Sequence, residues 1–195
     1  MLIPIAAMPK IAAAYASVQG LSCVCSEYGL GCGDEKERDV VNNYMQMAVE
    51  EGFKNILSGE GSPFGAVIVR KGELVARARN KVLLTNDPTM HAEMIAIRQA
   101  CEKLGRFDLS DCEIYSTCQP CPMCIGAIFW AKIPKLYYGA LDSDADAIGF
   151  SDKFIYDAIR ADFRGQKALA IETVDREGCL ELFKAWENKP DKHMY

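Results

Sequence analysis

Two short motifs in this 195-residue sequence contain residue types that bind metal ions. The first is His91-Ala92-Glu93, and the second, which begins 29 residues after His91, is Pro120-Cys121-Pro122-Met123-Cys124. Zinc binds neutral imidazole nitrogen and thiolate sulfur, and a catalytic zinc site uses three protein ligands and leaves the fourth position to water. His91, Cys121 and Cys124 supply that set. The sequence therefore predicts one catalytic zinc ion per chain.

Glu93 is predicted to carry protons rather than to bind the metal. A carboxylate that is not a ligand but lies beside a metal-activated water has the properties of a proton shuttle. Residues two apart do not share a helix face, so His91 and Glu93 converge only if a helix begins near residue 90. Cys121 and Cys124 are expected in the first turn of another helix, whose partial positive charge favours thiolates.

Two other interpretations of the cysteines remain open. Cys121 and Cys124 have the spacing of a thioredoxin-like redox pair, although such a pair needs no upstream His-x-Glu. Cys118, three residues before Cys121, could complete a four-ligand structural zinc site, but Glu93 would then have no role. The catalytic interpretation gives every residue of the two motifs a function.

The chain around the motifs alternates helix and strand patterns. A helix is expected from Asp34, which forms a capping-box pattern with Glu37, to the turn-forming residues 58–63. Two β-branched runs at 64–70 and 73–80 flank Lys71-Gly72 and predict a hairpin. After the hairpin we expect helices at about 89–104, 121–130, 152–160 and 178–187, and strands at about 113–117, 135–139 and 168–174.

This order of elements predicts an α/β fold. Strands separated by helices favour crossover connections, so we expect a largely parallel sheet covered by helices on both faces, which the hairpin makes mixed. Residues 1–36 differ in composition from the rest and are expected to form a poorly ordered extension. Residues 37–195 are expected to form one domain, because no long linker divides them.

Composition and charge limit the kinds of binding partner and the cellular compartment that we expect. The formal net charge of −5 repels phosphate backbones, so nucleic acid is a disfavoured partner. Nine irregularly spaced cysteines do not fit a disulfide-stapled secreted module and favour a reducing, cytoplasmic compartment. The apolar runs are too short to cross a bilayer, so no membrane partner is expected.

His-x-Glu followed by Pro-Cys-x-x-Cys is the signature of the zinc-dependent nucleobase and nucleoside deaminases. Within them the chain resembles the guanine deaminases of the cytidine deaminase fold, from about residue 39 to residue 195. Segments 61–69, 86–93 and 118–128 are shared widely with purine and tRNA deaminases. Gly149-Phe150-Ser151-Asp152 and a tail that ends in Tyr195 are the narrower part of the resemblance.

The resemblance implies a fold, a reaction and an assembly. The fold would be a three-layer α/β/α arrangement around a mixed five-stranded sheet. The reaction would be hydrolytic deamination of guanine to xanthine and ammonia, with guanosine or another base or nucleoside as the alternative and tRNA adenosine as a weaker one. The assembly would be a homodimer with a swapped C-terminal segment. A non-catalytic zinc-binding subunit is disfavoured, because degenerate family members usually lack the glutamate that Glu93 provides here.

The resemblance also assigns roles to individual residues. Asp152 would be a second carboxylate that assists departure of the amino group, and Ser151 stands where relatives often have another aspartate. Asn80 would hydrogen-bond the purine. The remaining substrate contacts would be the rings of Phe64 and Trp130, the backbone of Ala92, and Tyr195, which would close the site.

Overall fold

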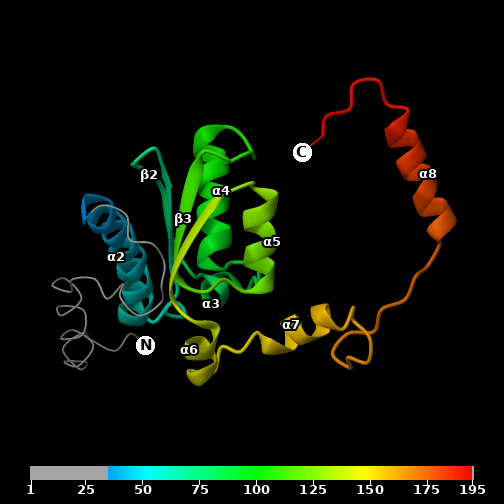
Figure 1. Ribbon diagram of the computed structural model, residues 1–195. Coiled ribbons are helices and arrows are strands. Elements are labelled where there is room, and N and C mark those ends of the chain that lie inside the picture. The colour runs from blue at the N-terminus through cyan, green and yellow to red at the C-terminus, as the bar shows by residue number, and fades with distance from the viewer. Residues whose placement is uncertain (1–34, 195) are drawn as a thin grey trace. The chain divides into compact units, whose positions relative to one another are not determined.

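The computed structural model describes residues 35–194, with side chains from residue 39 onward. The described residues divide into two units, one that ends at Asp152 and one that begins at Lys153. The first unit contains α2 (Glu35–Ser58), β1 (Gly65–Arg70), β2 (Glu73–Arg79), α3 (Val82–Thr85), α4 (Ala92–Leu104), β3 (Cys112–Cys118), α5 (Pro122–Trp130), β4 (Lys135–Ala140) and α6 (Asp142–Ala147). The elements are labelled in Figure 1.

One sheet of order β2-β1-β3-β4 forms the centre of the first unit. The predicted hairpin is confirmed, because β1 and β2 pair antiparallel around Lys71 and Gly72, whose φ angles are 50° and 79°. Two positive φ angles match the twist of the flanking strands in a two-residue hairpin turn. β1 also pairs antiparallel with β3, and only β3 and β4 are parallel. The sheet is therefore mixed, as predicted.

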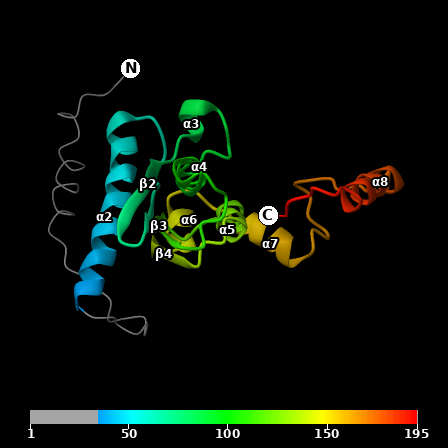
Figure 2. The ribbon, with the colours of Figure 1, turned by 90° about the horizontal axis from the view of Figure 1, so that it is seen from above.

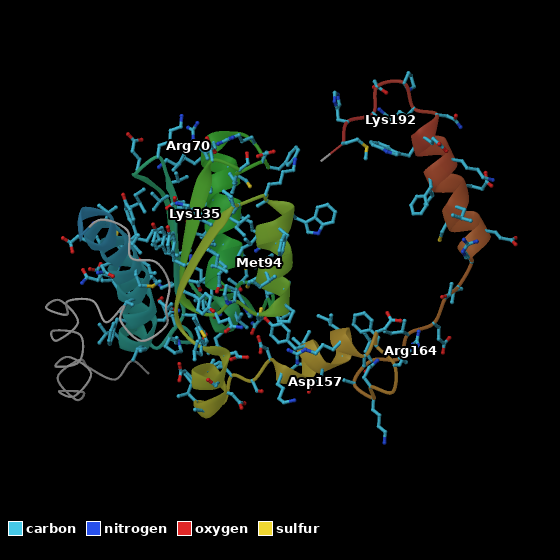
Figure 3. The ribbon with its side chains drawn as sticks, viewed as in Figure 1. Arg70, Met94, Lys135, Asp157, Arg164 and Lys192 are labelled. Atoms are coloured by element: carbon cyan, nitrogen blue, oxygen red, sulfur yellow. The ribbon has the colours of Figure 1, made fainter. Side chains whose placement is uncertain are left out.

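Helices cover both faces of the sheet and make three layers. Alternate residues of β1 point to opposite faces, as the strand period requires. Ala66 and Ile68 lie in a core cluster with apolar residues of α4, whereas Val67 and Val69 lie in a second cluster with α2 residues such as Tyr44. Figure 2 shows α2 on one side of the strands and α4 and α5 on the other. The predicted three-layer α/β/α architecture is confirmed.

Two details of the predicted sheet are wrong. Residues 168–174 form no strand, so the sheet in the described residues has four strands instead of five. This segment lies in the second unit and is exposed, and a β-branched run forms a strand only where a neighbouring edge pairs with it. The sheet is also not largely parallel, because β1 lies between β2 and β3 and runs antiparallel to both.

The second unit contains two helices, α7 (Lys153–Arg160) and α8 (Arg176–Glu187), close to the predicted positions. None of the side chains of these two helices is buried. Most of the predicted extension, residues 1–34, lies outside the described residues, and α2 begins at Glu35. Among residues 35–194, no helix has the combined length and hydrophobicity that a bilayer crossing requires.

Candidate active site

The three predicted metal ligands lie at the starts of two neighbouring helices. His91 is the N-cap of α4, and Cys121 is the N-cap of α5, with Pro122 at the first helical position. Proline suits that position because its fixed φ fits the helix and no N–H is lost from the hydrogen-bond pattern. Cys124 follows in the first turn and is fully buried. The predicted helix starts near residues 90 and 121 are therefore confirmed.

The geometry of these three residues fits zinc. Nδ1 of His91 lies 3.6 Å from Sγ of Cys121 and 3.6 Å from Sγ of Cys124. Ordinary zinc bond lengths in a tetrahedron place a nitrogen and a sulfur ligand about 3.6 Å apart. All three ligand atoms lie within 4.8 Å of one another, and no other group of three metal-binding side chains meets that limit in the described part of the chain.

The surroundings of Cys121 lower the pKa of its thiol. Hydrogen bonds from Cys124 and His91 outweigh burial and lower the pKa of Cys121 to about 4. The hydrogen bond with Cys121, together with burial and the nearby Glu93, raises the pKa of Cys124. The Cys121 interaction raises the pKa of His91 against the effect of burial. Cys121 is therefore a thiolate at neutral pH, the form that binds metal.

Glu93 lies beside the ligands without belonging to them. It is in the first turn of α4 and only 6% exposed. Oε1 accepts a hydrogen bond of 2.7 Å from the Ser116 hydroxyl, and Oε2 lies 3.5 Å from Sγ of Cys124. Burial raises the pKa of Glu93 above its ordinary value, although the Ser116 hydrogen bond opposes the effect. A buried carboxyl with a raised pKa next to a metal site is suited to proton transfer.

Cys118 is not a fourth ligand. It ends β3 and is buried, but its Sγ contacts the carbonyl oxygen of Leu141 at 3.5 Å. Burial raises the pKa of its thiol to about 11. Because Cys118 does not belong to the ligand group, the hypothesis of a four-ligand structural site is wrong.

Asp152 lies close enough to the ligand group to interact with it electrostatically. Burial raises the pKa of Asp152, and the charge of Cys121 adds to the effect. The charge of Asp152 in turn raises the pKa of His91. Phe150, two residues earlier, packs edge-on against Phe64 with ring centroids 5.2 Å apart. This aromatic contact holds Phe150 of the Gly149-Phe150-Ser151-Asp152 segment against Phe64.

Asn80 is held by three hydrogen bonds directly after β2. Its Oδ1 accepts from the N–H of Val82 at 3.1 Å, and its own N–H donates to the carbonyl of Phe64 at 3.0 Å. Its carbonyl accepts from Nδ2 of Asn55 at 2.7 Å. Asn80 is also buried, so these hydrogen bonds fix it beside Phe64. Ala92 is also buried, as the first residue of α4.

The structure does not bring Trp130 to the ligand group. Trp130 is the last residue of α5, whereas Cys121 caps its start, so the two are separated by roughly 13 Å along the helix axis. Its side chain is 67% exposed. Tyr195, the other predicted aromatic contact at the edge of the site, lies outside the described residues.

Sequence reasoning missed two buried polar residues that support the site, Ser116 and Asn55. Ser116 interrupts an otherwise apolar face of β3, on which Ile114 and Cys118 are its neighbours, and this alternation was a usable signal. Asn55 lies inside α2, where asparagine is unfavourable unless its side chain has a specific partner. Its Nδ2 donates to the carbonyls of Ser62 and Asn80.

Comparisons with known proteins agree with this geometry. Residues 38–140 match the cytidine and deoxycytidylate deaminase zinc-binding region. Guanine deaminase of Bacillus subtilis is 41% identical over 152 residues, which cover 78% of this chain and 97% of that protein. The tRNA-specific adenosine deaminase of Aquifex aeolicus is 41% identical over 99 residues, 51% of this chain and 65% of that protein.

Solved structures show the same relationship. The crystal structure of the Bacillus subtilis guanine deaminase has a TM-score of 0.73 at 40% identity and covers 78% of this chain and 97% of its own. The guanine deaminase of Nitrosomonas europaea has a TM-score of 0.54 at 26% identity, with coverage of 84% and 87%. The match over residues 38–140 includes all three ligands and Glu93. This chain belongs to the cytidine and deoxycytidylate deaminase family of zinc-binding enzymes.

Proposed function

We propose that the chain catalyses the hydrolysis of guanine to xanthine and ammonia. The observation that carries the proposal is the buried carboxyl of Glu93, which is not a ligand and lies 3.5 Å from the ligand sulfur of Cys124. Guanine is the favoured substrate because the similarity to a guanine deaminase extends over 97% of that relative. The similarity to the tRNA deaminase of Aquifex aeolicus covers 65% of that relative.

The protein groups divide the work of the reaction. His91, Cys121 and Cys124 would hold the zinc ion, which would lower the pKa of a bound water and so provide a nucleophile at neutral pH. Glu93 accepts a proton from the attacking water at Oε2 and passes it to a ring nitrogen next to C2. Asp152 shares the proton transfer to the departing amino group, since its raised pKa lets it hold a proton more readily than an ordinary aspartate. One guanine and one water give one xanthine and one ammonia.

Residues near the end of β2 orient the substrate. The Val82 N–H on Oδ1 fixes the side-chain amide of Asn80, which hydrogen-bonds the purine. Phe64 packs near the ring, supported by Phe150, and the Ala92 backbone supplies a polar contact. Tyr195 closes the site. Trp130 is left out of this set because it lies at the far end of α5.

The active form is proposed to be a homodimer with swapped C-terminal segments. α5 contains no charged residue, and the large side chains at its end, Phe129 and Trp130, are exposed. In the unit that follows Asp152, neither α7 nor α8 has a buried side chain, which suits a segment that packs on another body. Mixing a Glu93→Gln chain with a chain lacking Tyr195 tests the swap. If the tail of one chain closes the site of the other, the mixture regains activity that neither variant has alone.

A reducing compartment suits this site, and we place the enzyme in the cytoplasm. The six cysteines of the described residues are all free thiols. Two of them are zinc ligands, and oxidation to a disulfide would remove both from the metal. Fractionation of source cells followed by detection of the protein tests the location.

Transfer RNA adenosine is a further candidate substrate, weaker than guanosine, because a tRNA deaminase is 41% identical over 99 residues of this chain. The net charge of −5 disfavours it, since binding to nucleic acid relies on positive charge. Ammonia release by the zinc-loaded protein should be measured with guanine, guanosine, adenine, cytosine, cytidine and a tRNA. We expect turnover of guanine. Turnover of guanosine or of tRNA without turnover of guanine would contradict the proposal.

A further inference from the structure

A single polar side chain lies on the α4-facing side of the central strand β3. Ser116 is 1% exposed and pairs with Ala66 of β1, and its neighbours on the same face are Ile114 and Cys118. A buried hydroxyl is costly unless it has a hydrogen-bond partner. Alanine or valine would fill this buried position equally well, so packing does not explain why a hydroxyl group is present here.

The partner of that hydroxyl is the carboxyl of Glu93. Oγ of Ser116 donates to Oε1 at 2.7 Å, while Oε2 is the atom near the metal-ligand sulfur of Cys124. The two carboxyl oxygens thus have different surroundings. The terminal torsion of a glutamate side chain is broad and roughly two-fold, so without a fixed donor the carboxyl can rotate and exchange its oxygens.

The donor is attached to a rigid element. β3 pairs with β1 on one side and with β4 on the other, and Ser116 pairs through the backbone with residues of both. Glu93 is on the first turn of α4, which packs on the same face of the sheet. The Ser116 hydroxyl therefore connects the central strand to the helix that carries both His91 and Glu93.

We propose that Ser116 is a positioning residue for the proton-transfer step. Its hydroxyl holds Oε1 and thereby presents Oε2 to the reacting water and base. This inference rests on the proposed function, because it assigns to one atom of Glu93 the proton transfer described above. Catalytic groups held in place by the scaffold lose much of their effect when they shift by about 1 Å.

Three substitutions of Ser116 distinguish the effect of its hydroxyl group from the effect of its side-chain size. Ser116→Thr keeps the hydroxyl, and Ser116→Val has nearly the shape of threonine without it, so the two form a matched pair. Ser116→Ala removes the hydroxyl without adding a methyl group. Thr117→Val is the control on the opposite face of β3, where Oγ1 of Thr117 accepts from the N–H of Gly65 at 3.1 Å.

The kinetic experiment measures kcat and KM for guanine, zinc content and melting temperature for each zinc-loaded variant. We expect kcat to fall about 10- to 100-fold in the alanine and valine variants, with KM changed less than about threefold. The threonine variant should retain kcat within about threefold of wild type, and Thr117→Val should keep full kcat. Every variant should bind one zinc. Equal losses in the threonine and valine variants, loss of zinc from Ser116→Ala, or an unchanged kcat in Ser116→Ala would each overturn the proposal.

Crystal structures of the same zinc-loaded proteins give a second test that needs no activity. The Glu93 carboxyl should keep its orientation in wild type and Ser116→Thr, and should rotate or occupy two orientations in Ser116→Val. An unchanged carboxyl in Ser116→Val would overturn the positioning role. A wild-type enzyme without guanine turnover would instead overturn the proposed function, and the two failures are therefore distinguishable.

Discussion

The backbone N–H of Lys81 donates to the carbonyl oxygen of Met90 at 2.9 Å. Lys81 follows Asn80, and Met90 precedes His91, so one backbone hydrogen bond joins the end of β2, where the purine contact of Asn80 is proposed, to the start of α4, where the ligand group lies. The loop between them is tightened further at Asp87, whose Oδ1 accepts from both the N–H and the hydroxyl of Thr89 at 2.7 Å. The distance between Asn80, the proposed purine contact, and His91 is thus constrained by a main-chain hydrogen bond.

Glu93→Gln should abolish turnover without loss of zinc. Glutamine is close to glutamate in shape and can still accept the Ser116 hydrogen bond, but it cannot take up the proton of the attacking water. General acid–base groups contribute about 10²- to 10⁴-fold to rate, so kcat for guanine should fall by at least about 100-fold. Ammonia release and zinc content on the same sample check this. A kcat near wild type would contradict the role of Glu93.

The cysteines provide a matched test of the metal site. Cys121→Ser and Cys124→Ser should each lower zinc content and activity, because each removes one of three ligands. Cys118→Ser is the control, since Sγ of Cys118 faces the carbonyl of Leu141 and a hydroxyl can donate to the same oxygen. It should keep one zinc per chain. Metal analysis after exhaustive dialysis distinguishes the three variants, and loss of zinc from Cys118→Ser would contradict the three-ligand site.

The parts of this site that the sequence could predict are local. His91-Ala92-Glu93 and Cys121–Cys124 each occupy one helix start, so their spacing alone limits their geometry. The contact between Ser116 and Glu93 joins residues of a strand and a helix that are 23 positions apart in sequence. It depends on which face of the sheet Ser116 points to, and no local motif encodes this contact. Tertiary pairing also decided the missing fifth strand. Residues 168–174 have strand-like alternation but form no strand in the described residues, and Trp130 lies at the opposite end of α5 from Cys121.

Asn55→Ala should destabilise the protein and raise KM for guanine. Nδ2 of Asn55 donates to the carbonyls of Ser62 and Asn80 at 2.9 and 2.7 Å, and alanine removes this donor from both, including the buried carbonyl of Asn80. Loss of such a buried donor costs about 1–3 kcal/mol in the free energy of unfolding. Asn43→Ala, at an exposed position of the same helix, is the control and should change neither quantity. Denaturant unfolding and steady-state kinetics check the pair, and equal effects of the two variants would contradict the supporting role of Asn55.

Glu51 should make stability depend on pH in the acid range. Burial raises the pKa of Glu51, but hydrogen bonds from Lys54 and Arg77 outweigh it and hold the pKa below its ordinary value of 4.5. A carboxyl whose pKa is lower in the folded than in the unfolded state stabilises the fold above the unfolded pKa and loses that contribution as pH falls through the folded pKa.

The neutral variant Glu51→Gln removes this titration and leaves the rest of the ion-pair cluster in place. We therefore expect the difference in free energy of unfolding between wild type and Glu51→Gln to be largest at pH 6–7 and to shrink steadily below about pH 4.5. Urea unfolding at a series of pH values measures it, and because both proteins carry the same zinc ligands, acid release of metal affects both alike. A difference that stays constant between pH 7 and pH 3 would show that the lowered pKa of Glu51 makes no contribution to stability.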